Sequence, residues 1–366
     1  MPPNRRHFLR QSAPPAVLVF RHSPRLGGMG RAAEFFTPVL TRRCHVPAVI
    51  SLSASRVGSD RFAASWPAKA WATLAALSKG AYLLIGAAPR AVYLPVSQWG
   101  LPLLRDVFLI ALAKVVNCTA VLHLHGAQLP ARLAGNRALR ALLGGAHWIV
   151  LSEAVAHQLR VSGCRTASVT VLRNPAPRAV PSSKEPVSSR VLRVGWIGTM
   201  SRVKGFDLVC GAVETLRRQG VGVEFRVAGM RRDVPLTRMA CVDEDLGVLD
   251  LSDVLGFWAG VDAFVLPARW VEGLPFVLLE GLQAGCAVAA TPSPGSAELF
   301  GQGCVEPVEA SVASVAGFLA ACGDDLEGIR RRQQQAWDAL RPRYESDRIE
   351  EEFVQFWRNL GLERQQ

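Results

Sequence analysis

The sequence lacks the cysteine spacings of metal sites and disulfide frameworks. Its eight cysteines are scattered, with no C-x-x-C pair and no Cys/His cluster at metal-ligand spacing. This pattern argues against both a zinc site and a disulfide scaffold. Several of the cysteines stand inside apolar runs, so we expect reduced, buried thiols in a cytoplasmic protein.

Long apolar runs are also missing. The nearest candidate, 107–122, is interrupted by Lys114, whereas a membrane-spanning helix needs about 20 predominantly apolar residues. We therefore predict no transmembrane helix. The segment Arg5-Arg6-His7-Phe8-Leu9-Arg10 superficially resembles a twin-arginine export signal. The apolar stretch after it is short, contains two prolines and ends at Arg21, so we predict no export.

Acidic residues are scarce in the first half of the chain. Residues 1–185 hold 23 Lys/Arg and five Asp/Glu, and residues 186–366 hold 19 and 25, which gives net charges of +18 and −6. A basic half favours an anionic surface such as membrane lipid, nucleic acid or a phosphorylated acceptor. Only three tyrosines exist, and aromatic residues do not interleave with basic ones as in nucleic-acid modules. We therefore expect no nucleic-acid partner.

The 366 residues, 49% hydrophobic and 20% charged, suit two domains with real cores. Strand-like apolar runs alternate with helical segments in both halves, which is typical of an α/β fold. We predict a basic, poorly ordered start at 1–15 and a first domain at 16–174. A Pro- and Ser-rich linker is expected at 175–190, a second domain at 191–345, and a final segment at 346–366 with a helical apolar stripe.

The stretch 263–291 predicts a strand at 263–266, a loop, a helix and a second strand at 287–290. Glu272 lies in the loop, Gly273 and Pro275 open a helix over 276–284, and Glu280 lies within that helix. A helix start offers unpaired N–H groups and a positive dipole end, which suit a phosphate. Glu280 is about 7–8 Å further along the axis, the reach from a diphosphate to its ribose. The alternative is that both acids are solvent-facing charges near a helix start.

The pattern E-G-x-P-x-x-x-x-E, formed by Glu272, Gly273, Pro275 and Glu280, resembles the signature of the retaining glycosyltransferases of family 4 (glycosyl transferases group 1). The resemblance is strong over 192–298. It implies two doubly wound, Rossmann-like α/β domains that face one another across a cleft (GT-B type). The first would bind the acceptor and the second the nucleotide sugar, with the last helix packing back on the first domain.

A second motif follows the predicted strand 192–197. Residues 198–205 match the family's G-x(5)-K-G loop, which implies that Gly198 and Lys204 bind the donor diphosphate. Many members have an arginine directly after the first glycine; here Thr199 stands there, and we expect Arg202 to replace it. The alternative is that Lys204 is a surface charge. By the same resemblance, the donor-binding residues also include Gly273, Leu274 and Glu280, while Glu272 holds the sugar ring.

Two features of the first domain complete the expected site. Residues 28–33 match the dinucleotide pattern G-x-G-x-x-A, but the first of these glycines stands well after the strand and no acid lies near position 50, so we discount a nicotinamide cofactor. Gly27 and Gly28 instead resemble the family's Gly-Gly loop, before a helix expected over 31–37; a flexible loop is the alternative. His125 ends a buried strand, and the resemblance implies that it contacts the donor sugar, although a packed, structural histidine is the commoner case.

The resemblance thus implies retaining transfer from a nucleotide-diphosphate sugar to a glycan or polyprenyl-linked acceptor, in cell-envelope or exopolysaccharide synthesis. Glu272, His125 and Lys204 would be catalytic, with no metal and no cofactor besides the donor. The basic first domain adds an expected peripheral attachment to the anionic inner face of the plasma membrane. The alternatives are a nucleotide-sugar epimerase or glycan phosphorylase of the same architecture, or a non-catalytic polyanion- or polysaccharide-binding protein.

Overall fold

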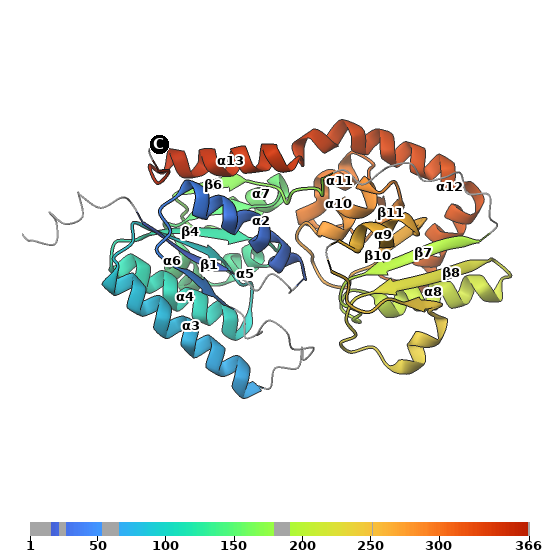
Figure 1. The fold of residues 1–366 in the computed structure, drawn as a ribbon, viewed down its shortest axis with the longest axis horizontal. Coiled ribbons are helices and arrows are strands. Elements are labelled where there is room, and N and C mark those ends of the chain that lie inside the picture. The colour runs from blue at the N-terminus through green and yellow to red at the C-terminus, as the bar shows by residue number, and fades with distance from the viewer. Residues whose placement is uncertain (1–15, 22–26, 53–65, 179–190, 251, 365–366) are drawn as a thin grey trace, which may run out of the picture. The chain divides into compact units, whose positions relative to one another are not determined.

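The computed structural model describes residues 16–21, 27–52, 66–178, 191–250 and 252–364 (Figure 1). The predicted N-terminal segment 1–15 and most of the predicted linker lie outside these residues. The chain divides into two compact units. The first consists of residues 1–172 and 350–366, and the second of residues 173–349.

The first unit is built on a six-stranded parallel sheet with the order β2-β1-β3-β4-β5-β6. Its central strands are buried along almost their whole length, as expected of a sheet covered on both faces. The strands are β1 Val17–Arg21, β2 Val49–Ser51, β3 Ala91–Pro95, β4 Thr119–Leu124, β5 His147–Val150 and β6 Ser168–Val171. The helices are α2 Gly27–Arg43, α3 Trp66–Gly86, α4 Gly100–Val115, α5 Leu129–Gly135, α6 Arg137–Leu143, α7 Glu153–Val161 and most of α13, Ser346–Asn359.

Helix α2 is much longer than the segment 31–37 that the sequence predicts, because it continues through Pro38. A proline inside a helix costs about 3 kcal/mol, since it removes one hydrogen bond and crowds the preceding turn. Phe36, Val39 and Leu40 on either side of Pro38 are almost fully buried, and this burial offsets the cost. The prediction ended the helix too early because local propensity does not register such packing.

The C-terminal end of the chain is part of the first unit's core. Phe353 and Trp357 on α13 are at most 1% exposed. The Phe353 ring packs on Phe36 at 4.8 Å and on Tyr93 at 6.0 Å, measured between ring centroids. A segment remote in sequence therefore completes the hydrophobic interior formed by α2 and β3.

The second unit is built on another six-stranded parallel sheet, ordered β12-β11-β10-β7-β8-β9. The strands are β7 Leu192–Ile197, β8 Val223–Ala228, β9 Glu244–Asp245, β10 Ala263–Leu266, β11 Ala287–Ala290 and β12 Glu306–Pro307. The α-helices are α8 Phe206–Arg218, α9 Val254–Ala259, α10 Phe276–Gln283, α11 Ala297–Gly301 and α12 Val312–Leu340. Short 3-10 helices are η1 Leu236–Cys241, η2 Pro294–Ser296 and η3 Arg341–Arg343.

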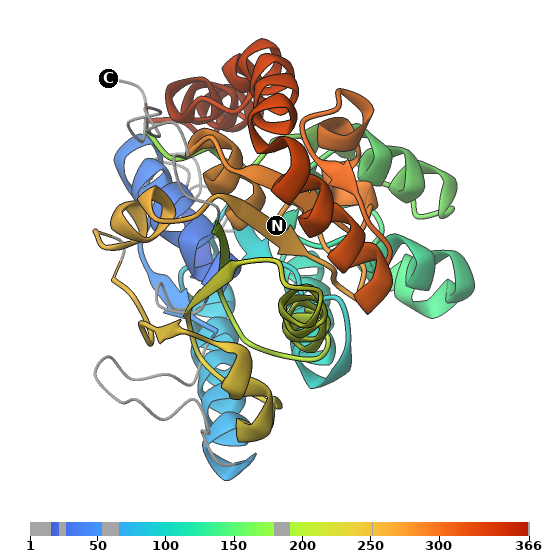
Figure 2. The same cartoon turned by 90° about the vertical axis from the view of Figure 1, so that its right-hand side faces the viewer.

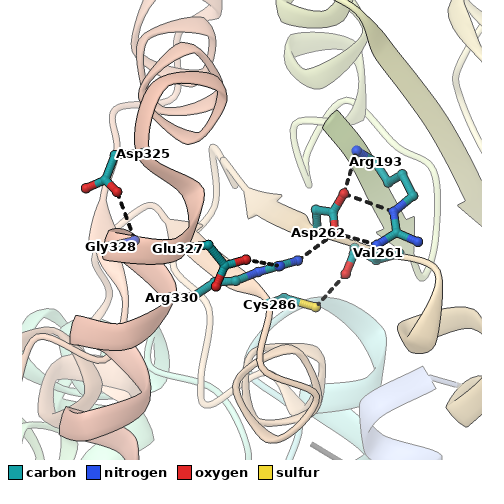
Figure 3. Close-up of polar contacts among 8 residues, drawn as sticks. All are labelled: Arg193, Val261, Asp262, Cys286, Asp325, Glu327, Gly328 and Arg330. Carbon is teal, nitrogen blue, oxygen red and sulfur yellow. Dashed lines mark hydrogen bonds and ion pairs between the residues drawn. The ribbon is translucent and has the colours of Figure 1, made fainter. Parts of the chain in front are cut away.

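Helix α12 is bent (Figures 1 and 2), and the bend coincides with Asp325, whose φ of −144° and ψ of 60° are not helical. The Asp325 carboxylate accepts a hydrogen bond from the backbone N–H of Gly328 at 2.9 Å. It thereby caps the second half of the helix. Close by, Arg330 of α12 reaches the buried Asp262 at the start of β10 (Figure 3).

Both sheets are parallel and carry helices, which confirms the predicted class of two doubly wound α/β domains. All eight cysteines are free and buried, as the sequence predicts. Among the described helices, none has the length and apolarity needed to cross a membrane.

Candidate functional site

The loop after β7 begins at a close approach between two strand ends. Gly198 and Gly229 follow β7 and β8, with φ values of +127° and +132° that favour glycine. A Cβ on Gly229 would lie 2.0 Å from the carbonyl oxygen of Gly198. Only glycine fits there, and the loop 198–205 is thereby fixed at the carboxyl end of the parallel sheet, where such folds bind ligands.

This loop brings Lys204 to Glu272, as an ion pair with 3.0 Å between the Lys204 Nζ and a carboxylate oxygen. The two side chains are 36% and 18% exposed, so both are half-buried. Gly205, with φ +83°, lies so close to Pro267 that a Cβ would be 2.1 Å from the Pro267 carbonyl oxygen. Two residues predicted from separate motifs therefore meet at one point of the second unit.

Arg269 holds this loop from the other side. Its backbone N–H donates to the carbonyl of Val203 at 2.9 Å, and its guanidinium forms two hydrogen bonds with Asp207, at 2.7 and 2.9 Å. Burial alone would raise the pKa of Asp207, but the bonds from Arg269 hold that pKa below its usual range. The backbone N–H of Arg202 also donates to Asp233, at 2.9 Å. The exposed Arg202 side chain thus extends from a well-anchored backbone.

Glu280 is in the interior of α10, only 2% exposed. One of its carboxylate oxygens accepts a hydrogen bond from the Trp258 indole N–H at 3.1 Å. The alternative of a solvent-facing charge is therefore excluded for Glu280. Within the described residues no side chain caps the start of α10, so the positive end of the helix dipole is there without a capping side chain.

The turn before α10 is fixed by groups distant in sequence. The Asn174 side-chain amide donates to the carbonyl of Leu274 at 2.7 Å. Gly295 packs so tightly on Gly273 that a Cβ would lie 2.1 Å from the Gly273 carbonyl carbon. Nearby in the chain, the Glu298 carboxylate accepts hydrogen bonds from Arg173, Arg343 and Tyr344.

Sequence reasoning did not identify Trp258, Asn174 or Arg269 as parts of this site. It also overlooked that Asp243-Glu244-Asp245 forms a D-x-D triplet, a pattern that can bind a metal. Asp243 accepts a hydrogen bond from the Phe225 backbone, and Glu244 pairs with Arg226. Among the described residues, no group of three or more His, Cys, Asp or Glu side chains is placed to hold a metal ion.

The first unit contains the other predicted residues. Gly27 and Gly28 form the exposed first turn of α2, with Gly27 at φ +60°. The His125 ring stacks on His123 with 3.9 Å between centroids. His123 is fully buried and shares a 2.7 Å hydrogen bond with the Tyr93 hydroxyl. Burial, and to a lesser degree His125, lowers the pKa of His123, so His123 is a neutral, packed residue beside a more accessible His125.

Most of the second unit is similar to a known protein family. Residues 191–330 match the model of a family described as glycosyl transferases group 1. No curated protein matches the chain. Among solved structures, it is similar to Anabaena Alr3699/HepE in complex with UDP-glucose, with 15% identity and a TM-score of 0.68 over 94% of this chain and 99% of that one.

Two further solved structures have the same fold. Sucrose-phosphate synthase from Thermosynechococcus elongatus is 13% identical, with a TM-score of 0.70 over 95% of this chain and 99% of that one. WaaG, a glycosyltransferase involved in lipopolysaccharide biosynthesis, is 13% identical, with a TM-score of 0.65 over 93% and 99%. Identities this low show the fold, which is that of the GT-B glycosyltransferases.

Proposed function

We propose that this protein, whose residues 191–330 match the model of the group 1 glycosyltransferases, moves a sugar from a nucleotide-diphosphate sugar to an acceptor hydroxyl. The observation that carries the proposal is the 3.0 Å ion pair between Lys204 and Glu272, at the carboxyl ends of β7 and β10. A cation and an acid held side by side near an uncapped helix start suit a donor with a diphosphate on one side and a sugar on the other.

The chemistry follows from where charge develops. As the bond between the sugar and the diphosphate breaks, the leaving diphosphate gains negative charge. Lys204 and the first N–H groups of α10 stabilise that charge, with Arg202 as a second cation. The arriving diphosphate replaces Glu272 as the partner of Lys204, and Glu272 then accepts hydrogen bonds from the sugar hydroxyls. Glu280, oriented by Trp258, accepts hydrogen bonds from the ribose.

The finer parts of the proposal concern outcome and acceptor. We propose that the anomeric configuration is retained, that no metal or cofactor besides the donor takes part, and that His125 contacts the sugar from the first domain. The acceptor is a glycan or lipid-linked glycan of the cell envelope, bound at the cytoplasmic face of the membrane. The similarity to the HepE complex with UDP-glucose and to WaaG supports this class of donor and acceptor.

The test combines donor binding and turnover. Purified protein is screened by thermal shift against UDP-, GDP- and ADP-sugars, since a bound donor raises the melting temperature by mass action. Transfer of the stabilising sugar is then measured for wild type, Lys204→Ala and Glu272→Gln. We expect kcat/KM to fall about 10²–10³-fold in both variants, as for other lost charge-stabilising groups.

Arg331→Ala, which removes an exposed cation on α12, is the matched control and should keep wild-type activity. Wild-type rates in both site variants would refute the assignment. A donor converted to its epimer without transfer would identify an epimerase instead, and donor binding without turnover a non-catalytic binding protein.

A further inference from the structure

The outer sides of α3 and α4 are apolar although they face solvent. Large apolar side chains on or next to these two helices are between 48% and 79% exposed, and they are Trp71, Leu74, Tyr82, Ile85, Trp99, Leu101, Leu104, Phe108 and Val115. The two helices lie side by side on the same face of the first sheet (Figure 1). We call these nine residues the α3/α4 face.

The exposed residues are not scattered. At 100° per residue, the four on α3 fall within an arc of about 80° and the four on α4 within about 60°. The opposite sides of the same helices, with Ala76 and Leu84 on α3 and Leu109 and Ile110 on α4, are buried in the core. A helix that is apolar on both sides is normally covered by other protein or by lipid on both sides. Here the sheet covers the inner sides of α3 and α4, and their outer sides face solvent.

Among the described residues on and next to α3 and α4, the exposed charges are basic. The only acid on the two helices is Asp106, which is fully buried in an ion pair with Arg105. Lys79 is exposed beside the α3 stripe, and Arg90 and Arg137 are exposed on neighbouring segments. Trp71, Tyr82 and Trp99 add aromatic rings of the kind that gather at membrane–water interfaces. A second copy of the same face would bring cations against cations.

We propose that the α3/α4 face docks on a lipid bilayer that contains anionic lipid. The apolar stripes enter the boundary between headgroups and acyl chains, and Lys79, Arg90 and Arg137 pair with lipid phosphates. The net charge of the first half already predicts attachment to a membrane, and the α3/α4 face is the surface that would make this contact. The proposal rests on the proposed function only in that the acceptor there is lipid-linked. Binding through this face should partly survive high salt, because salt screens the attraction between charges but not apolar insertion.

The test is flotation of the full chain with vesicles of phosphatidylcholine alone or mixed equally with phosphatidylglycerol. Wild type should float with the anionic vesicles and keep part of its binding in 0.5 M NaCl. The double variant Trp71→Ser/Leu104→Ser should partition at least about tenfold less, since each change removes an exposed apolar side chain that the bilayer would bury. The control Leu236→Ser/Val248→Ser removes two side chains that are 72% and 74% exposed in the second unit, and should float like wild type.

Two further measurements separate the outcomes. Lys204→Ala should float like wild type even if the proposed transfer reaction is wrong, because flotation needs no donor. Light scattering after size exclusion checks self-association. Equal flotation of the double variant and wild type would overturn the proposal. The proposal would also be overturned if wild type were a dimer and the same double variant a monomer, because the face would then join two copies of this chain.

Discussion

At the scale of single residues, the Asp262 carboxylate is held by two arginines, Arg193 and Arg330 (Figure 3). It is fully buried at the start of β10. The Arg193 backbone N–H and Nε both donate to one of its oxygens at 3.0 Å, and a terminal nitrogen of Arg193 and one of Arg330 donate to the other at 2.8 and 2.6 Å. These bonds join α12 to the amino ends of β7 and β10, which is the end of these strands opposite the candidate site.

Removing the Asp262 carboxylate should therefore destabilise the second unit strongly. We expect Asp262→Ala to lower the free energy of unfolding by about 3–5 kcal/mol, because Arg330 and Arg193 would be left without their buried partner. Urea unfolding followed by tryptophan fluorescence measures the loss. Asp324→Ala, which changes an exposed acid on α12, is the control. A loss below 1 kcal/mol in Asp262→Ala would contradict the structural role.

The same carboxylate should give stability a dependence on pH. Burial would raise the pKa of Asp262, but the bonds from Arg193 and Arg330 outweigh it, so the folded pKa lies below its usual value. A lowered folded pKa stabilises above the unfolded value, near pH 4, and this contribution is lost as pH falls through the folded pKa. The urea midpoint of wild type should therefore fall from pH 5 to pH 2.5. Asp262→Asn should show a shallower fall, and equal slopes would rule the contribution out.

Lys204, Glu272 and Glu280 could be picked from the sequence because each belongs to a short pattern around one strand end. Trp258, Asn174 and Arg269 could not, since each acts on a group that another part of the chain supplies. Trp258 orients a carboxylate 22 positions later, and Asn174 holds a carbonyl 100 positions later. Their roles depend on tertiary packing, which local spacing does not encode.

At the scale of elements, the approach of the Lys204 loop to the segment after β10 can be tested at Gly205. Gly205 and Gly220 both have φ +83°, but a Cβ has open space at Gly220 and only 2.1 Å to the Pro267 oxygen at Gly205. Gly220→Ala should cost about 1–2 kcal/mol from backbone strain. Gly205→Ala should cost a further 1–3 kcal/mol from overpacking and should also weaken donor binding.

Thermal melts with and without the nucleotide sugar measure both effects. Equal losses in the two alanine variants, with donor binding unchanged, would show that the close approach at Gly205 does not position Lys204.

Strand positions were the most predictable elements. The runs 192–197, 263–266 and 287–290 are strands with the predicted limits, because buried parallel strands are short apolar runs bounded by turn residues. Helix ends were less predictable. Helix α2 runs from Gly27 to Arg43, whereas the sequence predicts a helix only over 31–37. The burial of side chains on either side of Pro38 decides this limit.

At the scale of the whole molecule, the two-domain organisation follows from the alternation of strands and helices, which the sequence displays twice. The contribution of the C-terminal residues to the first unit is harder to anticipate, since a helical stripe does not say what it packs against. The asymmetry of charge is likewise only a partial guide. It indicates an anionic partner, but the surface that would contact this partner, the α3/α4 face, is located by the structure alone.

The division of the chain predicts how its parts behave when separated. The second unit is continuous, 173–349, and should unfold cooperatively by itself and be stabilised by the donor nucleotide. Residues 1–172 alone lack Phe353 and Trp357, whose loss leaves a large cavity beside Phe36 and Tyr93. We expect 1–172 to show no cooperative thermal transition by circular dichroism, and the fusion of 1–172 to 346–366 through a Gly-Ser linker to regain one. If 1–172 alone melts at the temperature of the fusion, α13 is not part of that core.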